Sequence, residues 1–173
     1  MYQSTYHSTM ACAMVRICSA VLAAMMLLAP LAAQDRLSAE QSRYDQETDP
    51  VRKARALVKL SEDQIDEARK QLKAGDDVGS LHSLERYRDE IQHMTEALKA
   101  TGVDAERKPG GFKELQISVR ENVRRIDDLI LTLPVDKRPF FRDVRTDLVK
   151  TQNELIDALF PRQPNQNSRK PNS

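Results

Sequence analysis

Apolar side chains recur alternately three and four residues apart along four stretches of the chain, which is the pattern of amphipathic α-helices. The stretches cover residues 50–74, 77–101, 111–133 and 137–160. In a heptad pattern of this kind the repeated positions face a shared core. The expected inward residues are Val51, Ala54, Val58, Ser61, Ile65, Ala68 and Leu72 in the first helix, Leu84, Tyr87, Ile91, Met94 and Leu98 in the second, Phe112, Leu115, Val119, Asn122, Ile126, Leu129 and Leu133 in the third, and Phe141, Val144, Leu148, Thr151, Leu155 and Ala158 in the fourth.

Helix-breaking residues separate these stretches. Asp49 and Pro50 form an N-cap followed by a proline at the first helical position. Gly75 ends the first helix, and either of the two aspartates that follow can cap the second; Pro134 ends the third, and Asp136 is expected to cap the fourth. Connections this short place consecutive helices antiparallel. We therefore predict an all-α fold, an antiparallel four-helix bundle built from two long helical hairpins over residues 49–160.

The N-terminal segment differs from the rest of the chain and predicts export. Residues 1–33 contain one base, Arg16, and the run from Ile17 to Ala33 carries no charge. A base, a short apolar run and small residues before a polar chain are typical of a signal peptide, here cleaved near Ala33. The run is short for a membrane span, which needs about 20 residues. An uncleaved N-terminal anchor is the alternative, and a translation start at Met14 would give a signal of more usual length.

Two polar segments flank the predicted bundle. Residues 34–48 form a polar lead-in with room for one short helix, capped by Ser38. Residues 161–173 contain bases but no acid and no apolar side chain suited to burial, so we predict a disordered tail.

Cysteine content and charge exclude several classes of function. Cys12 and Cys18, which are all the cysteines of the chain, lie in the predicted signal peptide, so the mature chain is expected to form no disulfide. Of the 27 Lys and Arg residues, all but Arg16 remain in the mature chain, and they balance its 26 Asp and Glu residues. A chain with no net charge has no overall field that attracts nucleic acid or an anionic membrane. We therefore expect a protein partner or self-association, no nucleic acid, and no stable membrane span after cleavage.

Motifs for catalysis, cofactors and metals are missing from the sequence. His82 and His93 stand 11 residues apart, about three helical turns, which is too far to share one ion. The sequence has no Cys-x-x-Cys-His for haem, no paired Glu-x-x-His, no Gly-x-Ser-x-Gly and no phosphate-binding loop. The prediction is a protein that is not an enzyme and holds neither a cofactor nor a metal.

Four apolar residues fall outside the predicted seams and form the candidate interaction surface. They are Ile117, Ile130, Leu131 and Phe140. Exposed apolar patches mark partner-binding sites. A broad apolar stripe that faces two neighbouring helices explains the same residues and is favoured, because bundle helices commonly use three positions per heptad. A second open point is Asn122, which either fixes the register from inside the core or gives its place to Val123.

The pattern Leu-Ser-x-x-Gln occurs twice, as "LSAEQ" at 37–41 and "LSEDQ" at 60–64. It resembles the Leu-Thr-x-x-Gln signature of small exported helical chaperone and stress-adaptor proteins, with serine in place of threonine in both copies. The resemblance implies a curved surface that binds unfolded clients or signalling partners without a cofactor or ATP. It would assign a role to Leu37, Ser38, Gln41, Leu60, Ser61 and Gln64.

Helix capping is the simpler explanation of the same pattern, because Ser followed three residues later by Gln is a capping box. The heptad around Ser61, however, is unbroken. A helix that is continuous at Leu60 and Ser61 would make the repetition a coincidence.

These observations lead to three functional hypotheses. The first is an exported, non-enzymatic helical protein that acts through protein–protein contacts. The second is a periplasmic client-binding chaperone or stress-signalling adaptor, which requires an exposed apolar face. The third is a small-ligand carrier that uses the bundle interior, which requires a polar-lined cavity there.

Overall fold

The computed structural model describes residues 36–161 of the 173-residue chain. The predicted signal peptide, both cysteines and nearly all of the predicted tail lie outside the described residues. Within them, residues 36–46 are helical and four long helices follow. These are α2 (Pro50–Lys73), α3 (Asp77–Ala100), α4 (Phe112–Thr132) and α5 (Arg138–Leu159).

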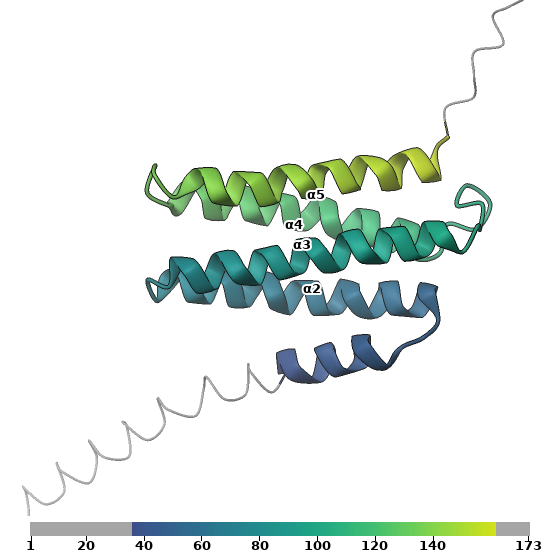
Figure 1. Cartoon of the computed structure of the whole chain (residues 1–173), viewed down its shortest axis with the longest axis horizontal. Helices are drawn as coiled ribbons and strands as arrows, with labels where there is room; N and C mark the ends of the chain where they lie inside the picture. Colours follow the sequence, from purple (N-terminus) through teal and green to yellow (C-terminus); the bar gives the residue numbers. More distant parts are fainter. Residues whose placement is uncertain (1–35, 162–173) are drawn as a thin grey trace, which may run out of the picture. The chain divides into compact units, whose positions relative to one another are not determined.

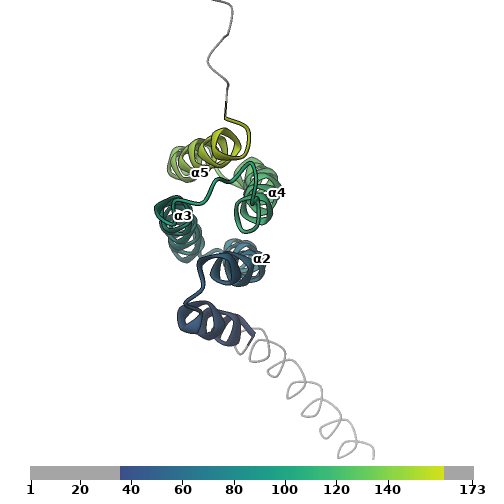
Figure 2. The ribbon, with the colours of Figure 1, turned by 90° about the vertical axis from the view of Figure 1, so that its right-hand side faces the viewer.

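The fold is all-α, since the part of the chain that the structure describes contains no strand. The four long helices pack together as a bundle, α2 beside α3 and α4 beside α5 (Figures 1 and 2). Each helix limit lies within one residue of the limit expected from the sequence. No helix among residues 36–161 is both long enough and apolar enough to cross a membrane.

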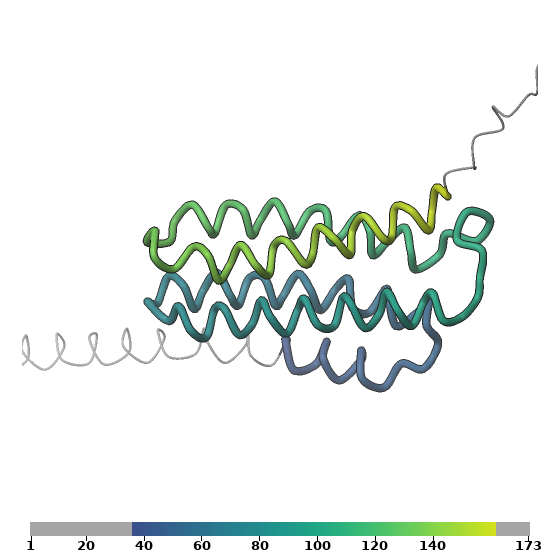
Figure 3. The backbone as a smooth tube through the Cα atoms, turned by 45° about the horizontal axis from the view of Figure 1, so that its top comes forward, coloured from purple at the N-terminus to yellow at the C-terminus, as the bar shows by residue number. Residues whose placement is uncertain are grey.

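Interhelical ion pairs show how α2 and α4 run relative to each other. Arg55 on α2 pairs with Glu114 on α4 at 3.1 Å, and Asp66 pairs with Arg125 further along both helices. Both pairs join residues 59 positions apart, so α2 and α4 lie side by side and run in the same direction. The longer connection between α3 and α4 makes this possible (Figure 3).

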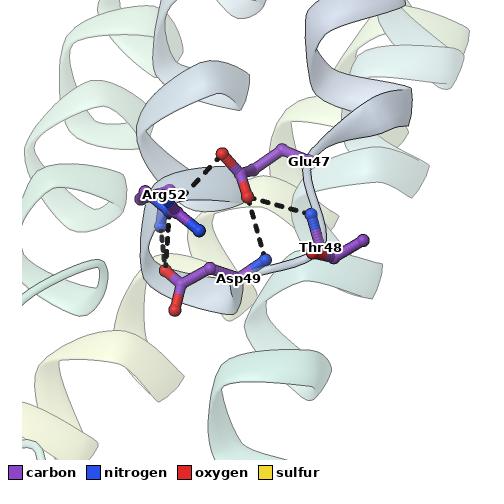
Figure 4. Close-up of polar contacts among 4 residues, drawn as sticks. All are labelled: Glu47, Thr48, Asp49 and Arg52. Carbon is purple, nitrogen blue, oxygen red and sulfur yellow. Dashed lines mark hydrogen bonds and ion pairs between the residues drawn. The ribbon is translucent and has the colours of Figure 1, made fainter.

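The start of α2 is fixed by side-chain capping (Figure 4). Asp49 occupies the N-cap and its carboxylate accepts a 2.8 Å hydrogen bond from the backbone N–H of Arg52. Glu47 accepts from the backbone N–H groups of Thr48 and Asp49 at 2.9 and 3.0 Å. The guanidinium of Arg52 in turn lies 3.5 Å from Glu47. The first-turn N–H groups that a helix leaves unsatisfied are thus partly bonded here.

The α2–α3 turn and the α4–α5 turn are stabilised by different interactions. Gly75 has φ of +83°, a left-handed conformation that favours glycine, and Asp76 then caps α3 by accepting from Gly79 N–H at 2.8 Å. At the start of α5 the expected cap, Asp136, is not the cap residue. Lys137 takes the N-cap position without a side-chain cap, and the guanidinium of Arg138 donates to the carbonyl of Leu133 at 3.0 Å.

The core confirms most of the predicted inward positions. Every expected inward residue of α3 and α4 is buried, and so are those of α5 except Ala158, which is half-buried while Leu159 beside it is buried. Burial of these apolar side chains is the main contribution that stabilises such a fold. It is worth about 25 cal/mol for each Å² of apolar surface removed from water.

The predicted seam of α2 was partly wrong. Val51, Val58 and Leu72 are only half-buried, whereas the buried residues of α2 include Leu57, Leu60 and Gln64. The reason is that α2 has more than one neighbour. It packs against α3 and α4, and Tyr44 from the preceding helical segment lies beneath the ammonium group of Lys53, 4.8 Å from the ring centre. The buried stripe of α2 is therefore wider than one heptad seam.

Neither Leu-Ser-x-x-Gln serine caps a helix. α2 is continuous through Leu60 and Ser61, and the Ser61 hydroxyl donates to the carbonyl of Val58 at 2.7 Å inside the helix. Ser38 is exposed and lies within a helical stretch that already includes Arg36 and Leu37. The prediction that Ser38 caps the short helix is therefore wrong, and the repeated pattern is not a repeated cap.

Candidate functional site

The four residues of the predicted interaction surface do not share one environment. Ile130 is buried, at 6% exposure, so in this fold it belongs to the core. Ile117 is half-buried and lines a groove between α2 and α4. Leu131 and Phe140 are exposed, at 72% and 57%. Ile130 thus widens the buried stripe of α4, and of the four only Leu131 and Phe140 are open to solvent to this degree.

Leu131 and Phe140 stand at one end of the bundle, where the α2–α3 and α4–α5 turns lie (Figure 1). Val78, the second residue of α3, and Val135, in the α4–α5 turn, are also strongly exposed there. We call Val78, Leu131, Val135 and Phe140 the apolar end. The two valines were not predicted, because they lie in or beside turns and outside the helical repeats that the periodicity reveals.

A groove of about 580 Å³ opens between the two turns of this end. Leu72, Leu129, Leu133 and Pro134 provide its apolar lining. Charged residues from both hairpins also line it; they are Arg69, Lys73, Asp77 and Asp128. Protein-binding surfaces likewise combine apolar with polar and charged residues.

A polar cluster of Ser61, Tyr87, Ser118 and Asn122 lies inside the bundle. The amide nitrogen of Asn122 donates to Ser61 at 3.1 Å and to Tyr87 at 3.2 Å, and the hydroxyls of Ser61 and Ser118 are 3.1 Å apart. All four side chains are buried, and they come from α2, α3 and α4. The structure also buries Val123, so Asn122 and Val123 both face the interior.

The polar cluster is built for structure rather than acid–base chemistry. Burial raises the pKa of Tyr87 well above its ordinary value, although the hydrogen bond from Asn122 acts in the opposite direction. The phenol therefore stays neutral at any physiological pH. The cluster contains no group that titrates near neutrality, which a general acid or base requires.

Glu90 on α3 joins three helical segments. Gln64 on α2 donates to one carboxylate oxygen at 2.7 Å, and Gln41 on the preceding helical segment donates to the other at 3.3 Å. Burial raises the pKa of Glu90 above its ordinary value, while the two glutamine donors act against that shift. Tyr44 lies close by, and burial together with the negative charge of Glu90 raises its pKa to about 12.

The environment of Gln64 adds an unusual feature to this site. Its side-chain oxygen is buried and has no hydrogen-bond partner among residues 36–161. A buried acceptor without a partner is costly. Gln41 and Gln64 are the glutamines of the two Leu-Ser-x-x-Gln copies, so the repetition brings both amides to one carboxylate. No sequence signal identified Glu90 as their common partner.

The histidines lie where the sequence places them, on the exposed side of α3. His82 and His93 border a shallow depression together with Asp89. Among the described residues no group of three or more His, Cys, Asp or Glu side chains has the arrangement of a metal site.

Comparisons with known proteins give no relative. No protein-family model, curated protein or solved structure matches the chain.

Proposed function

We propose that the chain is an exported, non-enzymatic helical protein that acts through protein–protein contacts made by the apolar end. The observation that carries the proposal is the exposure of these four large apolar side chains, at 57% to 77%, in or next to the two turns that also border the groove. Exposed apolar side chains gathered at one place on a small protein favour partner binding. Export rests on the charge-free apolar run between Arg16 and Gln34.

The proposal includes the architecture that presents this end. Two hairpins, α2–α3 and α4–α5, each antiparallel within itself, pack side by side so that both turns meet. The short connections after Lys73 and Thr132 support antiparallel hairpins. The Lys99–Glu154 ion pair of 2.6 Å, between α3 and α5, supports a fixed contact between the hairpins.

A pull-down from an envelope fraction tests the proposal. The full-length chain, the Leu131→Lys variant and a Val103→Lys control serve as baits. Val103 is exposed but lies in the α3–α4 connection, at the other end of the helices. We expect one stoichiometric partner with the wild type and with the control, and its loss with Leu131→Lys. Equal capture by all three baits would contradict a role for the apolar end, and retention of the full-length chain in the cytoplasm would contradict export.

A client-binding chaperone is the second candidate, and the same exposed apolar residues favour it. This function predicts that the chain suppresses the aggregation of an unfolded substrate and that Leu131→Lys weakens this effect. Recovery of only sequence-unrelated unfolded proteins in the pull-down would support the chaperone, whereas one stoichiometric partner would contradict it.

A further inference from the structure

The solvent-facing side of α2 carries a row of charges with opposite signs at its two ends. Arg52, Arg55, Lys59, Glu62 and Asp66 recur three and four residues apart, and all five are exposed. Side chains at this spacing share one face of a helix. We call these five residues the charged stripe. The core residues of α2, such as Leu57 and Ala68, occupy the opposite face.

Charges of the same sign are neighbours within the charged stripe. Arg55 and Lys59 are four residues apart, and so are Glu62 and Asp66. Like charges at this spacing destabilise an isolated helix, whereas alternating charges would stabilise it. Along α2 the bases are thus grouped in the first half of the charged stripe and the acids in the second half, at the expense of ion pairs within the helix.

The ion pairs that the stripe makes with α4 flank its centre. On α4, Glu114 is the ion-pair partner of Arg55, and Arg125 is the ion-pair partner of Asp66. Lys59 and Glu62 stand between them, at the point where the sign changes, and each is open to solvent. Arg43 borders the basic half in a groove of about 270 Å³, together with its ion-pair partner Glu40. A groove of about 520 Å³, which also includes Ile117, borders the acidic half.

A basic half followed by an acidic half on one helix is complementary to itself. When two copies of α2 lie antiparallel across a two-fold axis, any contact between positions i and j occurs twice. An axis between Lys59 and Glu62 places Lys59 of each copy opposite Glu62 of the other. The same axis places Arg55 of one copy opposite Asp66 of the other, because Arg55 lies four residues before Lys59 and Asp66 lies four residues after Glu62.

We propose that the charged stripe is a docking surface for a second copy of this chain, in an antiparallel two-fold arrangement. The two-fold axis also brings Arg52 of one copy toward Arg69 of the other, but each already lies within 4 Å of a carboxylate of its own chain. Val58, half-buried beside the stripe, adds apolar contact. This surface lies on the side of α2, so the proposal does not rest on the apolar end.

Contacts of this kind are screened by salt, because the pairs stay close to solvent. We expect the full-length chain to dimerise at low ionic strength and to dissociate as salt is raised. Sedimentation equilibrium measures the association constant in ~20 mM and ~500 mM sodium chloride, between which we expect a loss of at least about tenfold. A chain that is monomeric at all concentrations in low salt would overturn the proposal.

Charge reversal tests the pairing itself. Lys59→Glu alone brings two carboxylates together at each of these contacts, and Glu62→Lys alone brings two amines together, so each variant should lose association by about tenfold or more. An equimolar mixture of the two variants forms a heterodimer in which one contact joins two wild-type residues and the other joins the two reversed residues. Every contact there pairs opposite charges, so we expect association near that of the wild type. Variants that stay monomeric when mixed would overturn the two-fold arrangement.

Two control variants separate the charged stripe from the rest of the molecular surface. Lys150→Glu reverses an exposed charge on α5, away from the stripe, and should leave association unchanged. Leu131→Lys, which tests the apolar end, should also dimerise like the wild type. Circular dichroism of each variant checks that the helices form. A loss of association in Lys150→Glu equal to that in Lys59→Glu would show a general charge effect and overturn the proposal.

Discussion

The side-chain amide of Gln64 on α2 donates a 2.7 Å hydrogen bond to the carboxylate of Glu90 on α3. Gln41 donates to the other oxygen of the same carboxylate. One acid thus holds two helical segments against α3, and it does so from a half-buried position. The hydrogen bonds offset part of the cost of keeping a charge away from water.

Replacing Glu90 should separate its role as an acceptor from its charge. Glu90→Ala should lower the free energy of unfolding by about 1–3 kcal/mol, because the buried amide of Gln64 loses its partner. Glu90→Gln keeps one acceptor oxygen and nearly the same shape, so we expect a smaller loss. Urea unfolding of both variants measures the difference. Equal losses would show that one acceptor oxygen is not enough and that the charged carboxylate itself is required.

The pH dependence of stability should carry the signature of Glu90. Its pKa is higher in the folded chain than in the unfolded chain, so the folded state binds the proton more tightly. The wild type should therefore lose stability relative to Glu90→Gln as pH rises from below the unfolded pKa, near 4.5, through the folded pKa. Urea midpoints of both proteins across this range provide the measurement.

Glu114 provides an opposite trend as a control for that experiment. Despite some burial, hydrogen bonds from its own backbone N–H and from Gly111, together with Arg55, lower the pKa of Glu114. The stability that Glu114 contributes is present above its unfolded pKa and is lost as pH falls through the folded pKa. Relative to Glu114→Gln, the wild type should therefore lose stability toward acid. The same trend in both comparisons would contradict the assignment for Glu90.

Asn122 and Tyr87 should be energetically coupled. Asn122→Ala leaves the buried Tyr87 hydroxyl without its donor, and Tyr87→Phe removes that hydroxyl. A double-mutant cycle should give a coupling of about 0.5–1.5 kcal/mol, because the second substitution costs less once the first is present. Urea unfolding of the four proteins measures it. Strict additivity would show that the 3.2 Å contact contributes nothing.

Two glycines with similar backbone conformations should respond differently to alanine. Gly75 and Gly111 have φ of +83° and +84°, so alanine is strained at both. A Cβ at Gly75 meets nothing within 4 Å, whereas at Gly111 it would stand 3.0 Å from Leu98. We expect Gly75→Ala to cost about 1 kcal/mol and Gly111→Ala about 2–3 kcal/mol. Thermal unfolding compares them, and equal costs would show that Leu98 moves aside freely.

Removal of the observed caps should destabilise the chain while removal of the predicted one should not. Asp49→Ala and Asp76→Ala each delete an acceptor for a first-turn N–H, and each should cost about 0.5–2 kcal/mol. Ser38→Ala changes an exposed side chain within a helix and should cost less than about 0.5 kcal/mol. Thermal unfolding of the three variants measures these losses of stability. A loss for Ser38→Ala equal to the other two would show that Ser38 does act as a cap.

The sequence allowed the helices to be located because breakers and caps act locally. The Asp49–Pro50 start and the Gly75 end depend on residues next to them in the chain, so pattern alone identifies them. The inward positions of α3 and α4 were also predictable, since each has one dominant apolar stripe. The orientation of the helices within the bundle was harder to infer, and the parallel neighbours α2 and α4 became visible only through ion pairs between distant residues.

The errors on α2 and at the candidate site arise from contacts that local pattern does not encode. Gln64 is polar and was not among the expected inward residues, yet its partner Glu90 is 26 residues away and makes its burial possible. Leu57 and Leu60 are buried because α2 packs against several neighbours, and the sequence pattern of α2 alone does not show which helices those are. The exposed valines of the apolar end lie in or beside turns, where hydrophobic periodicity gives no information.

The polar cluster has a consequence for how α4 can slide along α2. Leu115 and Leu129 stand one heptad before and after Asn122, so an apolar stripe alone would accept a displacement of α4 by a whole repeat. Such a displacement would move Asn122 away from Ser61 and Tyr87 and remove its hydrogen bonds to them. A single buried amide therefore excludes alignments that the hydrophobic residues cannot tell apart.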